Sequence, residues 1–397
     1  MMHWTGYQRS DGRIGIRNYI AVIYLVECAH HVAREIAYPD RDIAHVIGFP
    51  GCYPNAYAQR MMERLSTHPN VGAVLLVSLG CESFNRFQLA KVIAAAGRPV
   101  ETLVIQDAGG TAYSIAQGQK IIAEFKDQLK STPQVEMGVN DLIVGTICGG
   151  SDGTSGITGN PAAGVAFDRL IQSGAACIFE ETGELIGCEH IMAERAITPE
   201  LGQEIRACVD KAAKYYATMG YGSFAAGNAQ GGLSTIEEKS LGAYAKSGSS
   251  SISGLIKPGD IPPRGGLYLM DVVPDGPVRF GFPNIADTAE IVELMASGTH
   301  LNLFVTGRGS VVGSALAPII KIAANPEMYD RMAGDMDVNA GRILTTGESL
   351  ENVGAEIYDL IISVASGTKT KSEGLGHSEF ILTYKSFDPI GPACLPA

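Results

Sequence analysis

The hydrophobic pattern of the first third of the chain alternates between two periods. Continuous apolar, β-branched runs predict buried strands at 18–26, 43–47, 71–79 and 100–105. Apolar residues at helical spacing predict helices at 29–37, 55–67, 84–96 and 111–129. A strand followed by a helix, repeated several times, favours a parallel sheet with helices on its faces.

A polar, proline-bearing stretch at 130–138 separates this unit from a second one, and we place a domain boundary near residue 135. The second unit is predicted to contain strands at 142–147, 175–179, 267–273 and 301–306, and helices at 162–173, 199–219, 318–324 and 350–365. We therefore expect an α/β fold of two units, 1–135 and 136–397, with mainly parallel sheets. Loops at the carboxyl ends of parallel strands converge, so the active-site crevice is expected there, between the units.

The region from about 220 to 266 interrupts this pattern. It is rich in Gly, Ser and Pro, and it carries one helical stretch at 235–245. A long segment of this composition is typical of a lid or of a loop wrapped over a site.

Composition and charge narrow the function classes. The net charge is −12, and no basic stripe is interleaved with aromatic residues, which argues against nucleic-acid binding. No signal-peptide pattern and no apolar run of membrane-spanning length are visible, so we expect a cytoplasmic protein without a membrane partner.

A glycine-rich run, CGGSDGTSGITGNP at 148–161, directly follows the apolar strand at 142–147. Five glycines in fourteen positions let backbone N–H groups and hydroxyls close around a small oxygen-rich anion. The candidate groups in this loop are the hydroxyls of Ser151, Thr154, Ser155 and Thr158 and the carboxylate of Asp152.

Four cysteines share one context, because Cys28, Cys52, Cys81 and Cys148 each lie at or just past the end of an apolar strand. If these ends converge, the thiolates would form a soft site for iron, an iron–sulfur cluster or zinc. The alternative is that each thiol is a small buried hydrophobe.

Several other side chains could act on an acidic substrate. Glu181 and His190 lie in an acidic stretch that could bind a cation or supply an acid and a base, although it could also be a solvated loop. Lys246 is a further candidate base. Arg17 and Arg308 sit in glycine-bearing turns and could hold a carboxylate, or they could be ordinary surface arginines.

Three familiar motifs are absent from the sequence. GxGxxG after the first strand, GxxxxGK[ST] and HExxH do not occur, so dinucleotide, nucleotide-phosphate and zinc-protease chemistry have no direct support.

Ordered matches along almost the whole chain resemble the altronate dehydratase and galactarate dehydratase family of sugar-acid lyases, whose relatives include the large subunit of sulfolactate sulfo-lyase. The matching stretches are DGRIGIRN at 11–18, GC at 51–52, LGCE at 79–82, CGGSDGTSGITGNPA at 148–162, GNAQGGLSTIEEKSLGAYAKSG at 227–248, FVTGRG at 304–309, DMDVNAG at 335–341, GE at 347–348 and ASG at 365–367.

The resemblance implies a lyase that removes water, or in one branch sulfite, from a 2-hydroxy acid with the help of iron(II). On this basis Cys52, Cys81 and Cys148 are expected to hold the metal with Cys28 nearby, as a single ion or as a cluster. The expected roles of the other residues then follow. The residues expected to bind substrate oxygens are Ser151, Asp152, Ser155 and Asn160, and Arg17 or Arg308 is expected to bind a carboxylate. The candidates for the general base are Glu181, His190 and Lys246.

The resemblance also implies partners. Single-chain members carry a small N-terminal β-rich domain before the segment that here begins at Trp4, so we expect a separate small β-domain subunit and an oligomer of large subunits. Of the two reactions in the family, we rank the loss of water to give a 2-keto-3-deoxy acid first and the loss of sulfite to give pyruvate second. A non-catalytic metal- or sugar-acid-binding subunit is a third alternative.

Overall fold

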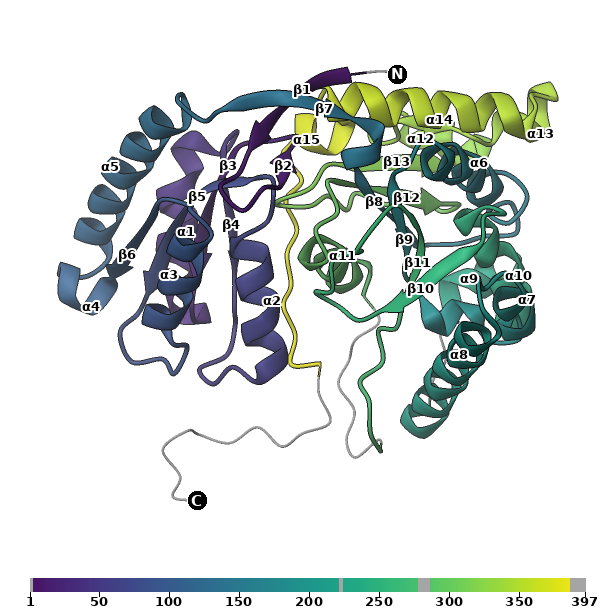
Figure 1. Cartoon of the computed structure of the whole chain (residues 1–397), viewed down its shortest axis with the longest axis horizontal. Coiled ribbons are helices and arrows are strands. Elements are labelled where there is room, and N and C mark those ends of the chain that lie inside the picture. Colours follow the sequence, from purple (N-terminus) through teal and green to yellow (C-terminus); the bar gives the residue numbers. More distant parts are fainter. Residues whose placement is uncertain (1–2, 221–223, 278–285, 386–397) are drawn as a thin grey trace.

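The computed structural model describes residues 3–220, 224–277 and 286–385 (Figure 1). Their strands form two parallel sheets of four and seven strands and one antiparallel sheet of three strands. The predicted α/β class with mainly parallel sheets is confirmed. No helix in these residues is both long and apolar enough to cross a membrane.

The four-stranded sheet has the order β4-β3-β5-β6, and all its pairings are parallel. Its strands are β3 (Tyr19–Tyr24), β4 (Ala44–Gly48), β5 (Val71–Ser78) and β6 (Val100–Val104). The helices that follow them are α1 (His30–Ala37), α2 (Ala56–Ser66), α3 (Arg86–Ala95), α4 (Ile105–Ala108) and α5 (Thr111–Leu129). Every residue of β3 and β5 is buried, as expected for strands that are covered on both faces.

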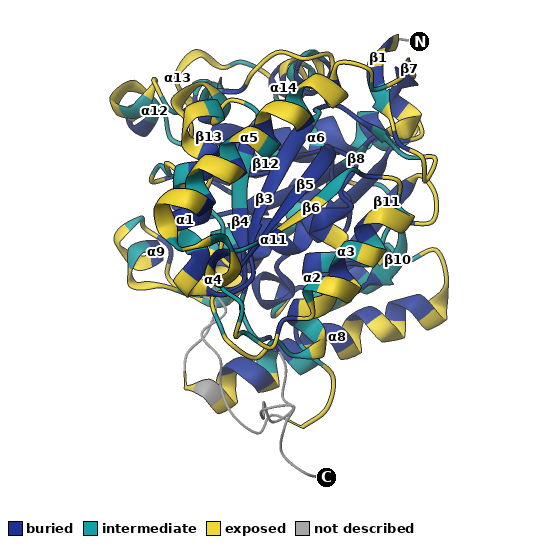
Figure 2. Ribbon diagram, turned by 90° about the vertical axis from the view of Figure 1, so that its left-hand side faces the viewer, coloured by how far each residue is buried: buried dark blue, intermediate teal, exposed yellow. Residues whose placement is uncertain are grey.

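The seven-stranded sheet has the order β10-β11-β9-β8-β12-β13-β14 and is parallel throughout. Its strands are β8 (Ile143–Cys148), β9 (Ala176–Phe179), β10 (Ile252–Ile256), β11 (Gly266–Met270), β12 (Leu301–Thr306), β13 (Ile319–Ala323) and β14 (Val338–Asn339). Its longer helices are α6 (Gly159–Gln172), α8 (Pro199–Met219), α11 (Asp287–Ala296) and α14 (Leu350–Ala365). Figure 2 shows the buried strands enclosed by helices whose outer faces are exposed.

Two predicted segments differ from the structure. Residues 318–324 were expected to be helical but form β13, because a short apolar run such as IIKIA fits a buried strand and a buried helix equally well. The polar stretch at 130–138 is not only a connection. Its second half is β7 (Gln134–Gly138), which pairs with β1 (His3–Gln8) in the antiparallel sheet beside β2 (Ile14–Gly15). The boundary placed near residue 135 therefore falls within β7, and the division into two domains stays a prediction.

The region 220–266 carries more regular structure than a lid would. It contains α9 (Ala226–Gln230), α10 (Ile236–Ala243), the 3-10 helix η5 (Tyr244–Ser247) and β10, which pairs with β11. Lys246 and Ser247 of η5 are buried. Most of this region is thus packed into the second unit, while 221–223 lie outside the described residues.

One of the hydrophobic clusters is shared by the two units. A single cluster of buried residues joins Ile47 and Leu76 of the four-stranded sheet to Leu294 of α11. Asn70 strengthens the junction, because its Nδ2 donates to the carbonyls of His300 at 3.0 Å and Leu316 at 2.9 Å. The helix α11 therefore lies between the two sheets (Figure 1).

The last described part of the chain, which we call the C-terminal segment (376–385), also runs between the units, from the helix α15 (Lys371–Leu375) past α2 (Figure 1). Asn55, just before α2, donates to the carbonyl of Tyr384 at 2.6 Å. The Tyr384 ring lies against Phe49, with ring centroids 5.2 Å apart. This segment thus connects the loop after β4 to the second unit.

Candidate active site

The glycine-rich loop after β8 is organised around one carboxylate. Asp152 Oδ1 accepts hydrogen bonds from the backbone N–H and the hydroxyl of both Thr154 and Ser155, at 2.6–3.2 Å. Its Oδ2 accepts from Asn325 at 2.9 Å. A Cβ added at Gly307 would lie 2.2 Å from the Asp152 carboxyl carbon, so only glycine fits there. Asp152, predicted to bind substrate, holds the loop in shape with both of its oxygens.

Cys148, at the end of β8, lies in a buried polar cluster. Its thiol is 3.1 Å from Glu184 Oε2, 3.5 Å from Glu181 Oε2 and 3.2 Å from Lys246 Nζ. Burial, and then the negative charge of Glu184, raises the pKa of this thiol to about 11. Within the protein alone the sulfur is therefore a neutral thiol at pH 7, and a cation would be needed to favour the thiolate.

Glu181 is held in an uncommon backbone conformation. Its φ is +89°, and it is the only non-glycine residue with positive φ among the residues described. Its Oε1 accepts from the backbone N–H of Cys148 at 2.9 Å, and its Oε2 is ion-paired with the 98%-buried Lys246. A strained residue kept in place by surrounding contacts is typical of a functional site.

A second ion pair in the cluster involves Glu184, which belongs to the 3-10 helix η4 (Thr182–Leu185). Lys239 of α10 pairs with Glu184, and both side chains are buried. The region interpreted as a lid thus contributes two lysines, Lys239 and Lys246, to a site whose carboxylates come from the turn after β9.

Further carboxylates lie next to this cluster, namely Glu180 directly after β9 and the acidic residues of α11. Glu180 is 1% exposed, and neither of its oxygens has a hydrogen-bond partner. Burial, and then the nearby charges of Glu290 and Glu293, raises its pKa well above the ordinary value. Burial also raises the pKa of Glu290 to about 8, with Asp287 as the next cause. The pKa of Asp287 is raised to about 6 by burial and then by Glu184.

Glu293, one turn further along α11, is fully paired. Lys385 of the C-terminal segment donates to both Glu293 oxygens at 2.8 Å, and the Tyr57 hydroxyl donates to Oε1 at 2.6 Å. The side chains of Lys385 and Glu293 are only 4% and 1% exposed. Both units and the C-terminal segment therefore meet at this carboxylate.

Two groups of side chains in this region have the spacing of metal ligands. Cys148, Glu181 and Glu184 form one, and Glu180, Glu181 and Glu290 form the other; within each, the ligand atoms lie within 4.8 Å of one another. The first group already faces the ammonium groups of Lys239 and Lys246. The second contains the unpartnered Glu180 carboxylate, which fits a bound cation, because a buried charge without a partner is costly.

The other predicted residues of the loop border a cavity of about 220 Å³. Ser151, Ser155, Asn160 and Lys239 line it, together with Asp152. Asn160 donates to the Gly242 carbonyl at 3.1 Å, while its Oδ1 has no partner. Since Lys239 also pairs with Glu184, this cavity adjoins the buried cluster.

Three predicted residues lie elsewhere. The Arg17 guanidinium pairs with Glu373 at 2.8 Å and donates to main-chain carbonyls, so it joins the N-terminal strands to α15. His190 is exposed on α7 (Glu189–Glu194). Arg308 is exposed, and donates to the Gly227 carbonyl at 2.8 Å. None of the three contacts the cluster around Cys148 in the hydrogen bonds and ion pairs of the described residues.

The expected convergence of four thiols is not found. Cys28, Cys52 and Cys81 are exposed at the ends of strands in the four-stranded sheet, whereas Cys148 is buried at the end of a strand in the other sheet. No group of potential metal ligands among the described residues includes the first three. Four similar sequence contexts thus belong to two different sheets, which the pattern alone does not distinguish.

Sequence reasoning did not select the carboxylates of α11 as site residues. Asp287, Glu290 and Glu293 are three residues apart and share one helix face, which was a usable signal. An acidic first turn is, however, the usual pattern of a solvated helix N-terminus. Only the packing of α11 between the two sheets shows that these side chains are buried.

Comparisons with known proteins identify the family of the chain. The family model for the D-galactarate/altronate dehydratase C-terminal domain matches residues 139–387, and the model for the second domain of D-galactarate dehydratase/altronate hydrolase matches 6–130.

Among curated relatives, (2R)-sulfolactate sulfo-lyase subunit beta from Chromohalobacter salexigens is 31% identical, covering 96% of this chain and 97% of that protein. Galactarate dehydratase (L-threo-forming) from Escherichia coli is 30% identical over 92% of this chain and 73% of its own length. Altronate dehydratase from Bacillus subtilis is 28% identical over 93% and 75%. The resemblance noted in the sequence is thereby confirmed, and the chain belongs to the D-galactarate/altronate dehydratase family of lyases.

Proposed function

We propose that this protein removes water from a sugar acid or a related 2-hydroxy acid to give a 2-keto-3-deoxy acid, with iron(II) as its metal. The observation that carries the proposal is the buried, unpartnered carboxylate of Glu180 beside Glu181 and Glu290. A bound cation would let Glu180 and Glu290 ionise despite their burial, and the group lies next to a buried lysine–carboxylate pair that can move a proton.

The metal would be held by Glu180 and Glu290, with Cys148 as a neighbouring sulfur ligand, while Glu181 stays paired with Lys246. When bound, it would supply a Lewis acid that stabilises negative charge on the substrate and activates the leaving hydroxyl. Among the four predicted thiolates, only Cys148 remains in this proposed ligand set.

Lys246 and Glu181 are the proposed proton-transfer pair. Lys246 Nζ is ion-paired with Glu181 and lies 3.2 Å from Cys148 Sγ, inside a site closed to water. The unprotonated member accepts the proton from the carbon next to the substrate carboxylate, and the protonated one returns a proton to the departing hydroxyl. The ammonium group of Lys239 would bind a negatively charged group of the substrate at the edge of the neighbouring cavity. Ser151 and Asn160, which line the same cavity, would form hydrogen bonds with substrate hydroxyls.

Loss of sulfite is the second candidate. The sulfo-lyase relative matches this chain over 97% of its length, whereas the matches to the dehydratases cover 73–75% of theirs. Because that relative is named as a subunit beta, we infer that this chain also works with a second, smaller subunit.

Turnover tests this proposal directly. The chain would be reconstituted anaerobically with iron(II), with and without a co-expressed small subunit, and incubated with altronate, galactarate and sulfolactate. Formation of a 2-keto-3-deoxy acid supports dehydration, and release of sulfite and pyruvate supports the second candidate. Absence of turnover with all three acids in the complete complex would refute the proposal that the protein is a lyase for these acids.

Metal analysis tests the ligand set. Bound iron is expected to fall in Glu290→Gln and in Cys148→Ser. Cys177→Ser is the matched control, since Cys177 is a buried thiol of the adjacent strand outside both ligand groups. Unchanged iron in Glu290→Gln would contradict the carboxylate site.

A further inference from the structure

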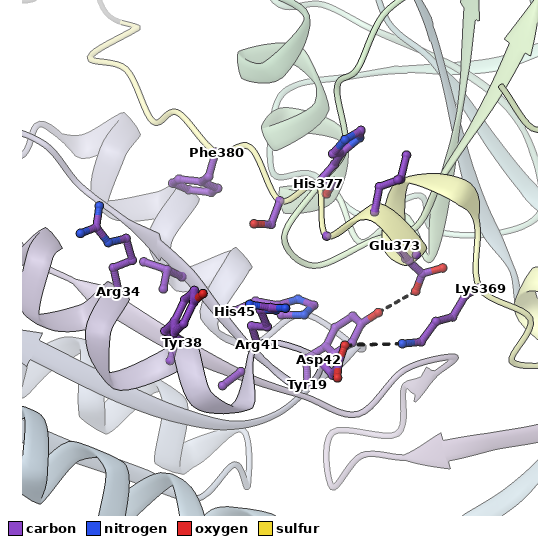
Figure 3. Close-up of a pocket in the computed structure, with 18 of the residues that line it drawn as sticks. Tyr19, Arg34, Tyr38, Arg41, Asp42, His45, Lys369, Glu373, His377 and Phe380 are labelled. Carbon is purple, nitrogen blue, oxygen red and sulfur yellow. Dashed lines mark hydrogen bonds and ion pairs between the residues drawn. The ribbon is translucent and has the colours of Figure 1, made fainter. Parts of the chain in front are cut away.

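A second, larger cavity shares no lining residue with the cavity of the candidate active site. It has a volume of about 680 Å³ and opens between α1 and β4 on one side and α15 with the start of the C-terminal segment on the other (Figure 3). None of the cysteines, carboxylates or lysines of the buried cluster lines it. Its volume is in the usual range for small-molecule sites.

Aromatic rings form much of its wall. Tyr19 and His45 are in contact, with ring centroids 4.2 Å apart, and Tyr24 is stacked on His30 at 4.7 Å. Tyr38 also lines the cavity and is 60% exposed (Figure 3). Such faces favour a flat ring, which stacks on them with its own face or edge.

The rim is positively charged. Arg34, Arg41 and Lys369 surround the cavity, in a protein whose net charge is −12. The Arg41 guanidinium lies 5.2 Å from the centre of the Tyr38 ring and takes part in no ion pair among the described residues. Lys369 is 3.8 Å from Asp42.

The carboxylate at the base of the cavity is already neutralised. Glu373 pairs with Arg17 at 2.8 Å and accepts from the Tyr19 hydroxyl at 2.8 Å. An anionic ligand would therefore meet exposed cations at the rim and a compensated carboxylate at the base.

We propose that this cavity binds a small planar anion, namely an aromatic or heteroaromatic ring that carries a phosphate or a carboxylate. The ring lies against the aromatic wall around Tyr38 and His45, and the anionic group pairs with Arg41 and Lys369. The proposal does not rest on the function proposed above.

The C-terminal segment links this cavity to the junction of the two units. His377 and Phe380 of the C-terminal segment line the cavity, and the same segment ends at Lys385, which is bound to Glu293.

Calorimetric titration of the full chain tests the binding. The probes are two ring-bearing anions, adenosine 5′-monophosphate and 4-hydroxybenzoate. Adenosine and inorganic phosphate, which are the two halves of adenosine 5′-monophosphate, serve as the comparison compounds. At least one ring-bearing anion is expected to bind about tenfold or more tightly than adenosine or phosphate, since adenosine lacks the charge-assisted contact and phosphate lacks the stacking contact.

Variants locate the site. Arg41→Gln is expected to weaken binding about tenfold. Arg86→Gln is the matched control, because Arg86 also lies over an exposed ring, that of Phe87 at 4.7 Å, but on α3 outside the cavity. The proposal is overturned if neither ring-bearing anion binds, if phosphate alone binds as tightly, or if Arg41→Gln has no more effect than Arg86→Gln.

Discussion

Replacing Lys385 by Met should destabilise the protein by a predictable amount. The ammonium group is the only cation paired with Glu293 in the described residues, through two contacts of 2.8 Å. After the substitution Glu293 keeps the Tyr57 hydroxyl but loses its cation, while Met fills most of the space of the lysine stem.

The expected loss follows from the cost of neutralising the orphaned carboxylate. Taking a proton at pH 7 costs an ordinary glutamate about 3.7 kcal/mol, because about 2.7 pH units separate pH 7 from its usual pKa, at about 1.36 kcal/mol each. Removal of one partner from a buried pair typically costs about 3–5 kcal/mol, which agrees. At pH 5 the same protonation costs only about 1 kcal/mol. The destabilisation should therefore grow as the pH rises from 5 to 7.

Urea unfolding followed by circular dichroism at pH 5 and pH 7 measures both values. Lys130→Met is the matched control, since Lys130 pairs with Asp127 at 2.7 Å but both side chains are more than 75% exposed. It should change the unfolding free energy by less than about 0.5 kcal/mol. The double variant Lys385→Met/Glu293→Gln should recover most of the loss. A loss below about 1 kcal/mol at pH 7, or one equal at both pH values, would refute the reasoning.

Three further predictions concern other parts of the molecule. Because the pKa of Glu290 is raised to about 8, the metal-free protein should lose stability as the pH rises from about 4.5 to about 8, by at most about 1.4 kcal/mol per pH unit. Urea unfolding in the presence of a chelator should show this slope, and Glu290→Gln should flatten it. Asp152→Asn should cost about 1–3 kcal/mol and speed amide hydrogen exchange in the glycine-rich loop, and unchanged exchange would contradict its organising role. Arg17→Lys should lower the unfolding free energy by about 2–4 kcal/mol by losing the forked contact with Glu373, whereas Arg34→Lys at an exposed pair should have little effect in the same assay.

Long elements could be predicted from the sequence with good bounds. The helices expected at 111–129, 199–219 and 350–365 have those limits in the structure, because caps and repeated apolar positions agree over many turns. The strand at 319–323 was misassigned, since five to seven apolar residues carry no decisive period. Short buried segments need their neighbours in the sheet to identify them.

The candidate site was only partly predictable. Cys148, Glu181 and Lys246 were selected from the sequence for different reasons, and the structure brings them together. Glu180 and Glu290 were not selected, because a carboxylate in sequence carries no sign of its burial. That burial arises from contacts between segments more than 100 residues apart.

The position of Lys385 has a consequence for synthesis of the chain. The ribosome makes the N-terminal sheet, the seven-stranded sheet and α11 before it makes this lysine, so Glu293 is enclosed by its neighbours before its counter-ion exists. Until residues 376–385 emerge, the junction of the two units must stay open to water or hold that carboxyl protonated. Nascent chains and products terminated before residue 385 would thus share one defect at the interface, a Glu293 carboxylate without its counter-ion.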